Sequence, residues 1–297
     1  MRRLMVPIRP PEPHWQPPGG ARYALGPMRD QAYLSYDYRL PELEHGYGPN
    51  IHLLADPVLL TQLARLCRPE TAQPDVTWLV RDMYETMVRM VIANEMPRAN
   101  TKIRTRMYEA TPNGVWTGSV LDSSTRAITV DIARAGTLPS QIAFEALVRL
   151  LEPDNVRQDH LYMARTTDED GTVTGVSMSG SKIGGDVDGA IILFPDPMGA
   201  TGGSMSRAAK VYKELEGTPL RIVSINLIVT PEYVQRMTQD HPDVVVYAIR
   251  LDRGMSDPAI FSTRLGDNVA AETGLNERQY IVPGAGGLGE ILNNSYV

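Results

Sequence analysis

The sequence is poor in cysteine, in basic charge and in long apolar runs. Its single cysteine, Cys67, cannot form a disulfide within the chain, so nothing indicates an oxidising compartment. No stretch approaches the roughly 20 apolar residues of a membrane span. The 29 Lys and Arg residues are outnumbered by 35 Asp and Glu residues, which argues against a nucleic acid or an anionic membrane as the main partner. Any phosphate-binding site must therefore be local.

Metal-ligand and hydrolase motifs are also missing. The five histidines show no H-E-x-x-H or similar spacing, so we predict no metal site built by the chain itself. There is no G-x-S-x-G elbow, and a hydrolase is not indicated. Behind Met1-Arg2-Arg3 the apolar stretch ends at Pro10-Pro11, which is too short for a secretory signal. We expect a cytoplasmic protein.

The N-terminal segment differs in composition from the rest of the chain. It is rich in Pro, Gly and Tyr and shows neither helical nor strand period, so we predict an irregular arm over 1–49. Residues 50–297 have the composition of one globular domain. Their first regular element is a helix predicted over 57–66.

A second helix is predicted to start at Asp75, with that residue as its N-cap, and to end before Pro97. The methionines from Met83 to Met90 recur on this helix at helical spacing. They form either part of the core or a subunit interface.

Further along, short β-rich runs alternate with helical runs, which is typical of an α/β sheet with crossover helices. Strands are predicted at 127–133, 158–164, 189–194, 221–229 and 244–251, and helices at 139–151, 205–216 and 232–237. Between them, the Gly- and Ser-rich stretch 166–188 is expected to be a hairpin or a mobile flap. A polar insertion is expected at 253–272.

One stretch carries most of the chemical information. After the apolar run Ala190 to Phe194 comes DPMGATGGSM, residues 196–205, and then a helix pattern. A bare strand-to-helix turn needs fewer such residues. Glycine-freed N–H groups, hydroxyls and a helix N-terminus can cradle a phosphate, and Asp196 can accept hydrogen bonds from sugar hydroxyls. Met205 stands where a P-loop needs lysine, so the pattern favours a phosphorylated ribose.

Three motifs resemble the uracil phosphoribosyltransferases. DPMGATGGS is similar to their phosphoribosyl-diphosphate (PRPP) loop, D-P-M-L-A-T-G-G-S, with Gly199 in place of leucine. Residues 133–136, A-R-A-G, resemble the diphosphate loop L-R-A-G. Residues 274–284 resemble the segment L-N-x-x-x-Y-I-V-P-G of the base-binding hood, which would occupy 274–297 here.

The resemblance implies a fold and an activity. The fold is the phosphoribosyltransferase type of α/β fold, a mainly parallel sheet flanked by helices with a C-terminal hood. The activity is transfer of the phosphoribosyl group of PRPP to N1 of uracil, giving UMP and pyrophosphate, with Mg2+ bound mainly through PRPP. It also implies a homodimer or higher homo-oligomer, and GTP as an effector in some relatives.

The resemblance implies roles for individual residues as well. Arg134 would hold the leaving pyrophosphate and Asp196 the ribose hydroxyls, and these two are the catalytic residues. The residues that would bind PRPP are Arg134, Arg165, Asp196, Pro197, Met198, Gly199, Ala200, Thr201, Gly202, Gly203 and Ser204. Arg165 matches a family arginine if its loop is two residues longer. The residues that would bind uracil are Tyr280, Ile281, Gly286, Gly287 and Leu288.

Two departures from the family pattern leave alternatives open. The hood's first aspartate corresponds to Gly287, and Asp131 replaces a proline near the diphosphate loop. The chain is therefore either a uracil phosphoribosyltransferase, a PRPP- or nucleotide-binding protein without turnover, or a transferase for another acceptor. The G-x-G-x-x-G match at 284–289 does not indicate a dinucleotide fold, because no βαβ run follows it.

Overall fold

The computed structural model of the chain describes residues 30–167 and 173–295. The side chains of residues 164–167, 173, 174 and 176 lie outside this description. The chain divides into two compact units: one comprises residues 36–99 and 119–297, and the other comprises residues 1–35 and 100–118.

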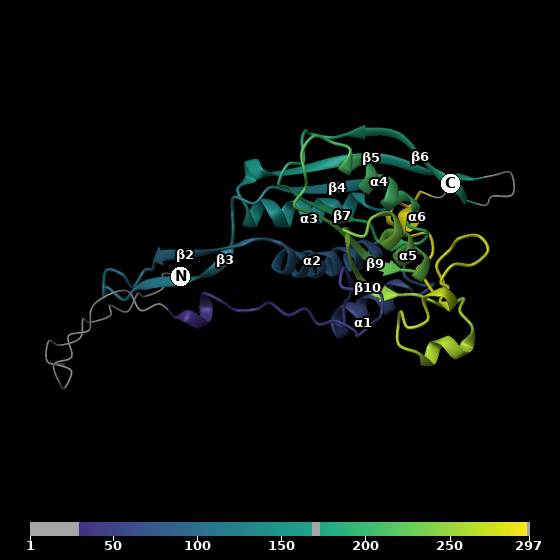
Figure 1. Cartoon of the computed structure of the whole chain (residues 1–297), viewed down its shortest axis with the longest axis horizontal. Coiled ribbons are helices and arrows are strands. Elements are labelled where there is room, and N and C mark those ends of the chain that lie inside the picture. Colours follow the sequence, from purple (N-terminus) through teal and green to yellow (C-terminus); the bar gives the residue numbers. More distant parts are fainter. Residues whose placement is uncertain (1–29, 168–172, 296–297) are drawn as a thin grey trace, which may run out of the picture. The chain divides into compact units, whose positions relative to one another are not determined.

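The larger unit is built on an eight-stranded sheet (Figure 1) in the order β1-β10-β9-β7-β4-β5-β6, and β8 pairs with β9. The strands are β1 (Ile51–Leu53), β4 (Ala127–Ala133), β5 (Val156–Thr167), β6 (Val173–Lys182), β7 (Ile191–Pro195), β8 (Met198–Gly199), β9 (Arg221–Val229) and β10 (Val245–Leu251). Neighbouring strands run parallel except β5 and β6. The prediction of an α/β fold with a mainly parallel sheet is confirmed.

Helices cover both faces of the sheet. Alternate residues of each strand therefore pack into two separate cores, one on each face. Ile191 and Leu193 of β7 belong to the core with α1, α2 and α3, whereas Ile192 and Phe194 belong to the core with α4 and α5. The helices are α1 (Pro57–Leu66), α2 (Asp75–Glu95), α3 (Thr137–Leu150), α4 (Gly203–Lys213), α5 (Pro231–Asp240) and α6 (Leu288–Asn293). This alternation is the pattern of a sheet buried on both sides.

On α2 the predicted N-cap needs correction, and the prediction that the methionines belong to the core is confirmed for Met83 and Met87. The N-cap is Pro74, which makes no side-chain hydrogen bond, and Asp75 is the first helical residue, where its charge complements the helix dipole. Met83 and Met87 are fully buried in the core, so the alternative of a subunit interface is wrong for these two residues. Trp78 on the same helix is 61% exposed.

The stretch predicted as a hairpin or flap over 166–188 forms a hairpin. Its second strand, β6, pairs antiparallel with β5 and places Lys182 opposite His160. The tip at 168–172 lies outside the described residues. Of the arm predicted over 1–49, residues 1–29 also lie outside, and the described part contains a short 3-10 turn at Gln31–Tyr33.

One pair of strands was not predicted from the sequence. β2 (Arg98–Arg104) and β3 (Val115–Leu121) form a two-stranded sheet, most of which belongs to the smaller unit. Within that unit the guanidinium of Arg104 lies 4.4 Å from the centre of the Tyr108 ring. Most side chains of β2 are exposed, so the strand lacks the apolar alternation by which a sequence reveals a strand.

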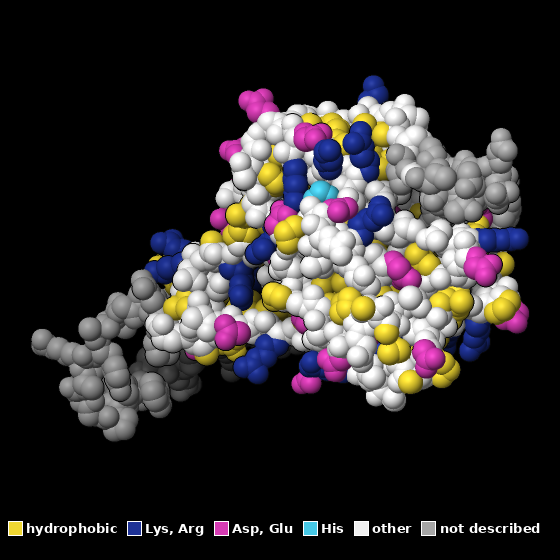
Figure 2. Space-filling model, turned by 45° about the vertical axis from the view of Figure 1, so that its right-hand side comes forward, with side chains coloured by type: hydrophobic (Ala, Val, Ile, Leu, Met, Phe, Trp, Pro, Cys, Tyr) yellow, Lys and Arg dark blue, Asp and Glu magenta, His cyan; other side chains and the backbone are white. Residues whose placement is uncertain are grey.

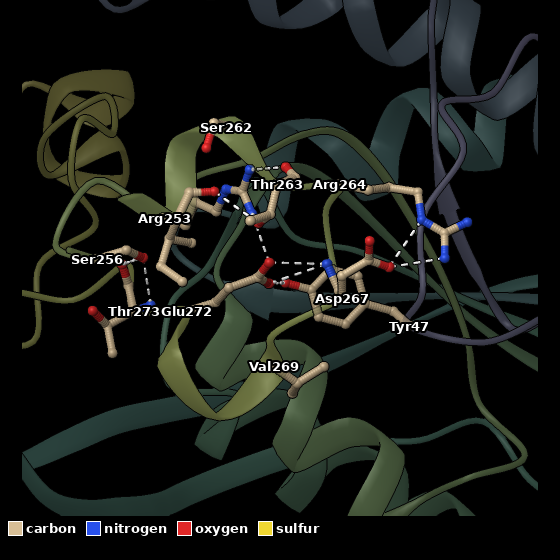
Figure 3. Close-up of polar contacts among 12 residues, drawn as sticks. Tyr47, Arg253, Ser256, Ser262, Thr263, Arg264, Asp267, Val269, Glu272 and Thr273 are labelled. Atoms are coloured by element: carbon tan, nitrogen blue, oxygen red, sulfur yellow. Dashed lines mark hydrogen bonds and ion pairs between the residues drawn. The ribbon is translucent and has the colours of Figure 1, made fainter. Parts of the chain in front are cut away.

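The polar insertion after β10 is held by a buried network (Figure 3). The Arg253 guanidinium donates to Glu272 Oε1 over 2.6 Å, and the Tyr47 hydroxyl donates to Oε2 of the same carboxylate. The Gly266 N–H also donates to Glu272, over 3.0 Å, and Arg253 donates to the Thr263 carbonyl over 2.8 Å. The two ends of the insertion are thereby tied to each other and to the segment before β1.

The surface charge is mixed. Figure 2 shows Lys and Arg side chains interspersed with Asp and Glu side chains over the face in view. Such mixing does not concentrate polyanions the way a surface of one sign does. Among the helices of residues 30–167 and 173–295, none combines the length and apolar character that a membrane crossing requires.

Candidate active site

The winding of the sheet changes side between β4 and β7. From β4 the chain crosses through α3 to β5, and from β7 it crosses through α4 to β9, with the two helices on opposite faces. Diverging crossovers leave a crevice at the carboxyl ends of the two strands, which is where open α/β sheets bind ligands. Arg134 follows β4 and Asp196 follows β7, so the two predicted loops flank this crevice.

The loop after β7 is fixed by its backbone and ends in a helix N-terminus. The Asp196 N–H donates to the Ile225 carbonyl over 3.0 Å, and Asn226 Nδ2 donates to the Asp196 carbonyl over 2.6 Å. Gly202 caps α4 with a φ of 76°, a conformation that disfavours residues with a Cβ. The N–H groups of the first helical turn therefore face the crevice end of the strand, an arrangement that suits a phosphate.

The packing leaves no room at position 199 for the leucine of the family motif. A Cβ at this position would lie 2.9 Å from both the Tyr233 ring and Val229 Cγ1. Tyr233 is 2% exposed and its hydroxyl lies 2.7 Å from Ser224 Oγ. Burial raises the pKa of Tyr233, so the phenol stays protonated. The tyrosine ring occupies the space that a larger residue at position 199 would need.

The diphosphate loop also depends on a glycine. A Cβ on Gly136 would lie 2.9 Å from the backbone of Ile132 and 3.1 Å from the Pro195 carbonyl oxygen. Only glycine lets this loop close against the end of β7. Arg134 is exposed, and its Nη1 donates to Ser295 Oγ over 2.8 Å.

Asp131 does not present its charge to the site. The carboxylate is 3% exposed and lies 3.0 Å from His160 Nδ1. It also accepts a hydrogen bond of 3.1 Å from Thr137 Oγ1, at the start of α3. Ile132, the next residue along β4, lines the crevice. Burial and these partners from β5 and α3 keep the Asp131 carboxylate off the cavity wall.

The hood is anchored to the sheet by two carboxylates. Glu232, at the start of α5, accepts hydrogen bonds from the N–H groups of Gly274 (2.9 Å) and Leu275 (3.3 Å). Asp252, which is 1% exposed, accepts one of 2.8 Å from the Gly284 N–H. Charged acceptors make these bonds stronger than neutral ones. They hold the hood across from the loops after β4 and β7.

The three segments enclose one cavity of about 750 Å³, a size typical of ligand sites. The predicted PRPP residues on its wall are Arg134, Asp196, Met198, Ala200, Thr201, Gly202, Gly203 and Ser204. All five predicted uracil residues also line it: Tyr280, Ile281, Gly286, Gly287 and Leu288. The structure thus brings most of the predicted site together.

Two predicted residues stand apart from the wall. Gly199 pairs with Val229 of β9, and the Pro197 carbonyl accepts a hydrogen bond of 3.0 Å from the Leu227 N–H. Both act through the backbone that positions the loop. Arg165 lies in β5, and its side chain is outside the described part of the chain.

The cavity wall also contains residues that sequence reasoning missed. These are Ile132, Ala133, Ala135, Met163, Met205, Tyr233, Gln279, Gly289 and Glu290. Gln279 is next to a recognised motif, which is a signal that could have found it. Met163 and Tyr233 come from β5 and α5, and only the tertiary fold brings them to the cavity.

Gly287 is covered by a nearby carboxylate. A Cβ at this position would contact the Glu290 carboxylate, which reaches back from the first turn of α6. Glu290 lines the cavity. The part of the hood that lacks the family's aspartate therefore carries a carboxylate supplied by Glu290.

The donor set suits a cation that arrives with its ligand. Asp196 and Glu290 are the carboxylates on the cavity wall. Within residues 30–167 and 173–295, no three or more His, Cys, Asp or Glu side chains gather as a metal cage. Mg2+ commonly uses one or two carboxylates together with substrate phosphates, and this wall fits that mode.

Comparison with solved structures supports the fold. The AQ2163 protein from Aquifex aeolicus superimposes with a TM-score of 0.64 and 20% sequence identity, over 83% of this chain and 99% of that one. At this identity the similarity establishes the arrangement of helices and strands.

Sequence comparisons identify the family. The uracil phosphoribosyltransferase of Dictyoglomus turgidum is 28% identical over 211 residues, which cover 71% of this chain and 92% of that protein. That of Caldanaerobacter subterraneus is 34% identical over 111 residues, covering 37% of this chain and 42% of the relative. A family model described as uracil phosphoribosyltransferase matches residues 53–269, from β1 into the insertion. With this match over most of its length, and with both predicted phosphate loops on one cavity, the chain belongs to the uracil phosphoribosyltransferase family.

Proposed function

We propose that the chain transfers the phosphoribosyl group of PRPP to N1 of uracil and releases pyrophosphate, forming UMP. The observation that carries the proposal is the shared cavity. The diphosphate loop with Arg134, the phosphate loop with Asp196 and the hood with Tyr280 form its three sides. PRPP has two anionic ends, which fit the two phosphate-binding sides, and a neutral base beside it fits the side formed by the hood.

The charges of the site match those of the reaction. As the bond between C1′ and pyrophosphate breaks, positive charge grows on the ribose and negative charge on the leaving group. Arg134 would bind the leaving pyrophosphate, and the Asp196 carboxylate would bind the ribose hydroxyls next to the developing cation. N1 of uracil then forms the new bond to C1′ and its proton leaves. Preorganised charge is the main contribution of the protein.

To bind pyrophosphate, Arg134 must give up its present hydrogen-bond partner. In the structure it donates to Ser295, near the end of the described chain, through both the hydroxyl and the carbonyl. Pyrophosphate would replace these neutral acceptors with charged ones, which bind a guanidinium more strongly. The exposed position of Arg134 allows that exchange.

Bound Mg2+ would neutralise part of the phosphate charge. The carboxylates of Asp196 and Glu290, which line the cavity, would hold it.

We also propose a homo-oligomer, to which the exposed Trp78 of α2 could contribute apolar contact. Analytical ultracentrifugation tests this proposal. GTP activation, a property of some relatives, is tested by adding GTP to the transfer assay. A cytoplasmic location stays a proposal for cell fractionation to test.

The transfer assay follows radiolabelled uracil into UMP with PRPP and Mg2+. Arg134→Ala should lower kcat/KM by about 10- to 150-fold, because one charge-assisted contact is lost. Arg149→Ala is the matched control, since Arg149 is an exposed arginine at the far end of α3. Equal activity of the Arg134 variant and the control would contradict the proposed site. Absence of UMP from wild-type protein that binds PRPP would favour a sensor or another acceptor.

A further inference from the structure

Gln279 has an unusual backbone conformation at the cavity. Its φ is 63°, in the left-handed region that disfavours residues with a Cβ. Among the described residues other than glycine, only Gln279 and Asn294 have positive φ. Such conformations persist where the surroundings fix them, and they occur often at functional sites.

The turn around Gln279 is fixed by its neighbours. Asn276 Oδ1 accepts hydrogen bonds of 3.0 Å from the N–H groups of both Arg278 and Tyr280. The Gln279 N–H donates to the Asn276 carbonyl over 2.9 Å, and Asn276 N–H donates to the Tyr280 carbonyl over 3.0 Å. Leu275 and Ile281 close the turn with an antiparallel bridge. These bonds hold Gln279 in the strained conformation.

The side chain of Gln279 is placed for a ligand. It is half-buried and lines the cavity beside Tyr280 and Ile281, on the side formed by the hood. Its carboxamide makes no hydrogen bond to another of the described residues. A carboxamide offers N–H donors and a carbonyl acceptor together. The chain thus holds an uncommitted, neutral polar group at the wall of the cavity.

This inference rests on the proposed function. We propose that Gln279 is a specificity-determining residue that binds the acceptor base through its carboxamide. The N–H would donate to a ring carbonyl oxygen of uracil, and the amide oxygen would accept from the adjacent ring N–H. Uracil presents these two groups side by side, so one side chain can engage both.

The charge distribution favours the base over PRPP as the partner of Gln279. The phosphates have a cationic clamp in Arg134 and a helix N-terminus at Gly203. Gln279 carries no charge and belongs to the hood, between Asn276 and Tyr280. A neutral donor and acceptor pair complements a neutral heterocycle better than it complements a polyanion.

The test separates the two KM values. Gln279→Gly removes the carboxamide and also relieves the backbone, because glycine adopts positive φ readily. We expect the KM for uracil to rise about 10- to 100-fold, because two hydrogen bonds to the base are lost, with the KM for PRPP unchanged. The melting temperature should hold or rise. Gln279→Glu, which keeps the shape but loses the N–H donor, should also raise the KM for uracil.

The matched control is Asn294→Gly. Asn294 has a φ of 46° and does not line the cavity, so its replacement should raise the melting temperature without changing either KM. An unchanged KM for uracil in Gln279→Gly, or an equal rise in the KM for PRPP, would overturn the role of Gln279. Wild-type protein that forms no UMP would reject the proposed function itself, and this role with it.

Discussion

Removing the Glu272 carboxylate should destabilise the protein more than any other single change to the insertion. Glu272 is 1% exposed and accepts hydrogen bonds from Arg253, Tyr47 and the Gly266 N–H. In Glu272→Ala the Arg253 guanidinium, itself 9% exposed, is left buried without a counter-charge. Breaking a buried ion pair in this way costs about 3–5 kcal/mol.

A matched double variant separates the unpaired charge from lost packing. Arg253→Met combined with Glu272→Leu removes both charges and keeps apolar volume, so it loses the hydrogen bonds from Tyr47 and Gly266 but leaves no buried charge unpaired. Tyr47→Phe removes one hydrogen bond and should cost about 1 kcal/mol. The single Glu272 variant should therefore be the least stable of the three.

Urea unfolding followed by circular dichroism measures these differences. With an m-value of about 3 kcal/mol/M, the midpoint of Glu272→Ala should fall by about 1–1.7 M. The insertion also touches the hood, since the Gly254 N–H donates to the Val282 carbonyl over 2.9 Å. Because this contact supports the hood, the KM of Glu272→Ala for uracil should also rise. A Glu272→Ala midpoint equal to that of the double variant would show that the unpaired Arg253 charge has no measurable cost.

Three further predictions concern the cavity and the thiol. Asp196→Asn should weaken PRPP binding by about 1–3 kcal/mol in calorimetry, and equal affinity would remove Asp196 from the site. Gly287→Asp should raise uracil transfer if a hood aspartate is needed, with the new carboxylate in place of that of Glu290; unchanged turnover counts against that need. Burial, with a smaller effect of the Asp252 charge, raises the pKa of Cys67 from 9.0 to about 11. The contribution of the buried thiol to stability is present below pH 9 and is lost as pH rises toward 11, because the thiol ionises more easily in the unfolded chain. At pH 8 a disulfide reagent should therefore react with the folded protein about 100-fold more slowly than with protein unfolded in urea, and equal rates would show an accessible thiol.

Much of the sheet could be predicted from local patterns. The strands at 127–133 and 221–229 and the helix at 57–66 have the predicted bounds, because apolar runs and flanking Pro or Gly mark them directly. β6 was predicted only as one possibility, since its Ser- and Gly-rich sequence becomes a strand by pairing with β5. Asp75 was misassigned because Pro74 fills the cap position.

The site was predictable where its chemistry is local. The loop at 196–204 holds its candidate residues within one short stretch, so its composition indicates a phosphate site, whereas the loop at 133–136 was predicted only from its resemblance to the family's L-R-A-G. The need for glycine at position 199 could not be predicted in this way, because it comes from the Tyr233 ring, which α5 brings near. Likewise, the partners of Asp131 come from β5 and α3 and could not be inferred from neighbours along the chain.

Transfer of the phosphoribosyl group to uracil is tested most directly by supplying the protein with PRPP, Mg2+ and one acceptor at a time. Chromatography would follow nucleotide and pyrophosphate formation with uracil, orotate, cytosine, hypoxanthine or no acceptor. We expect UMP and pyrophosphate in equal amounts with uracil, and little product with the others. Nucleotide formed only from a different base, or none from any base by protein that binds PRPP, would contradict this expectation.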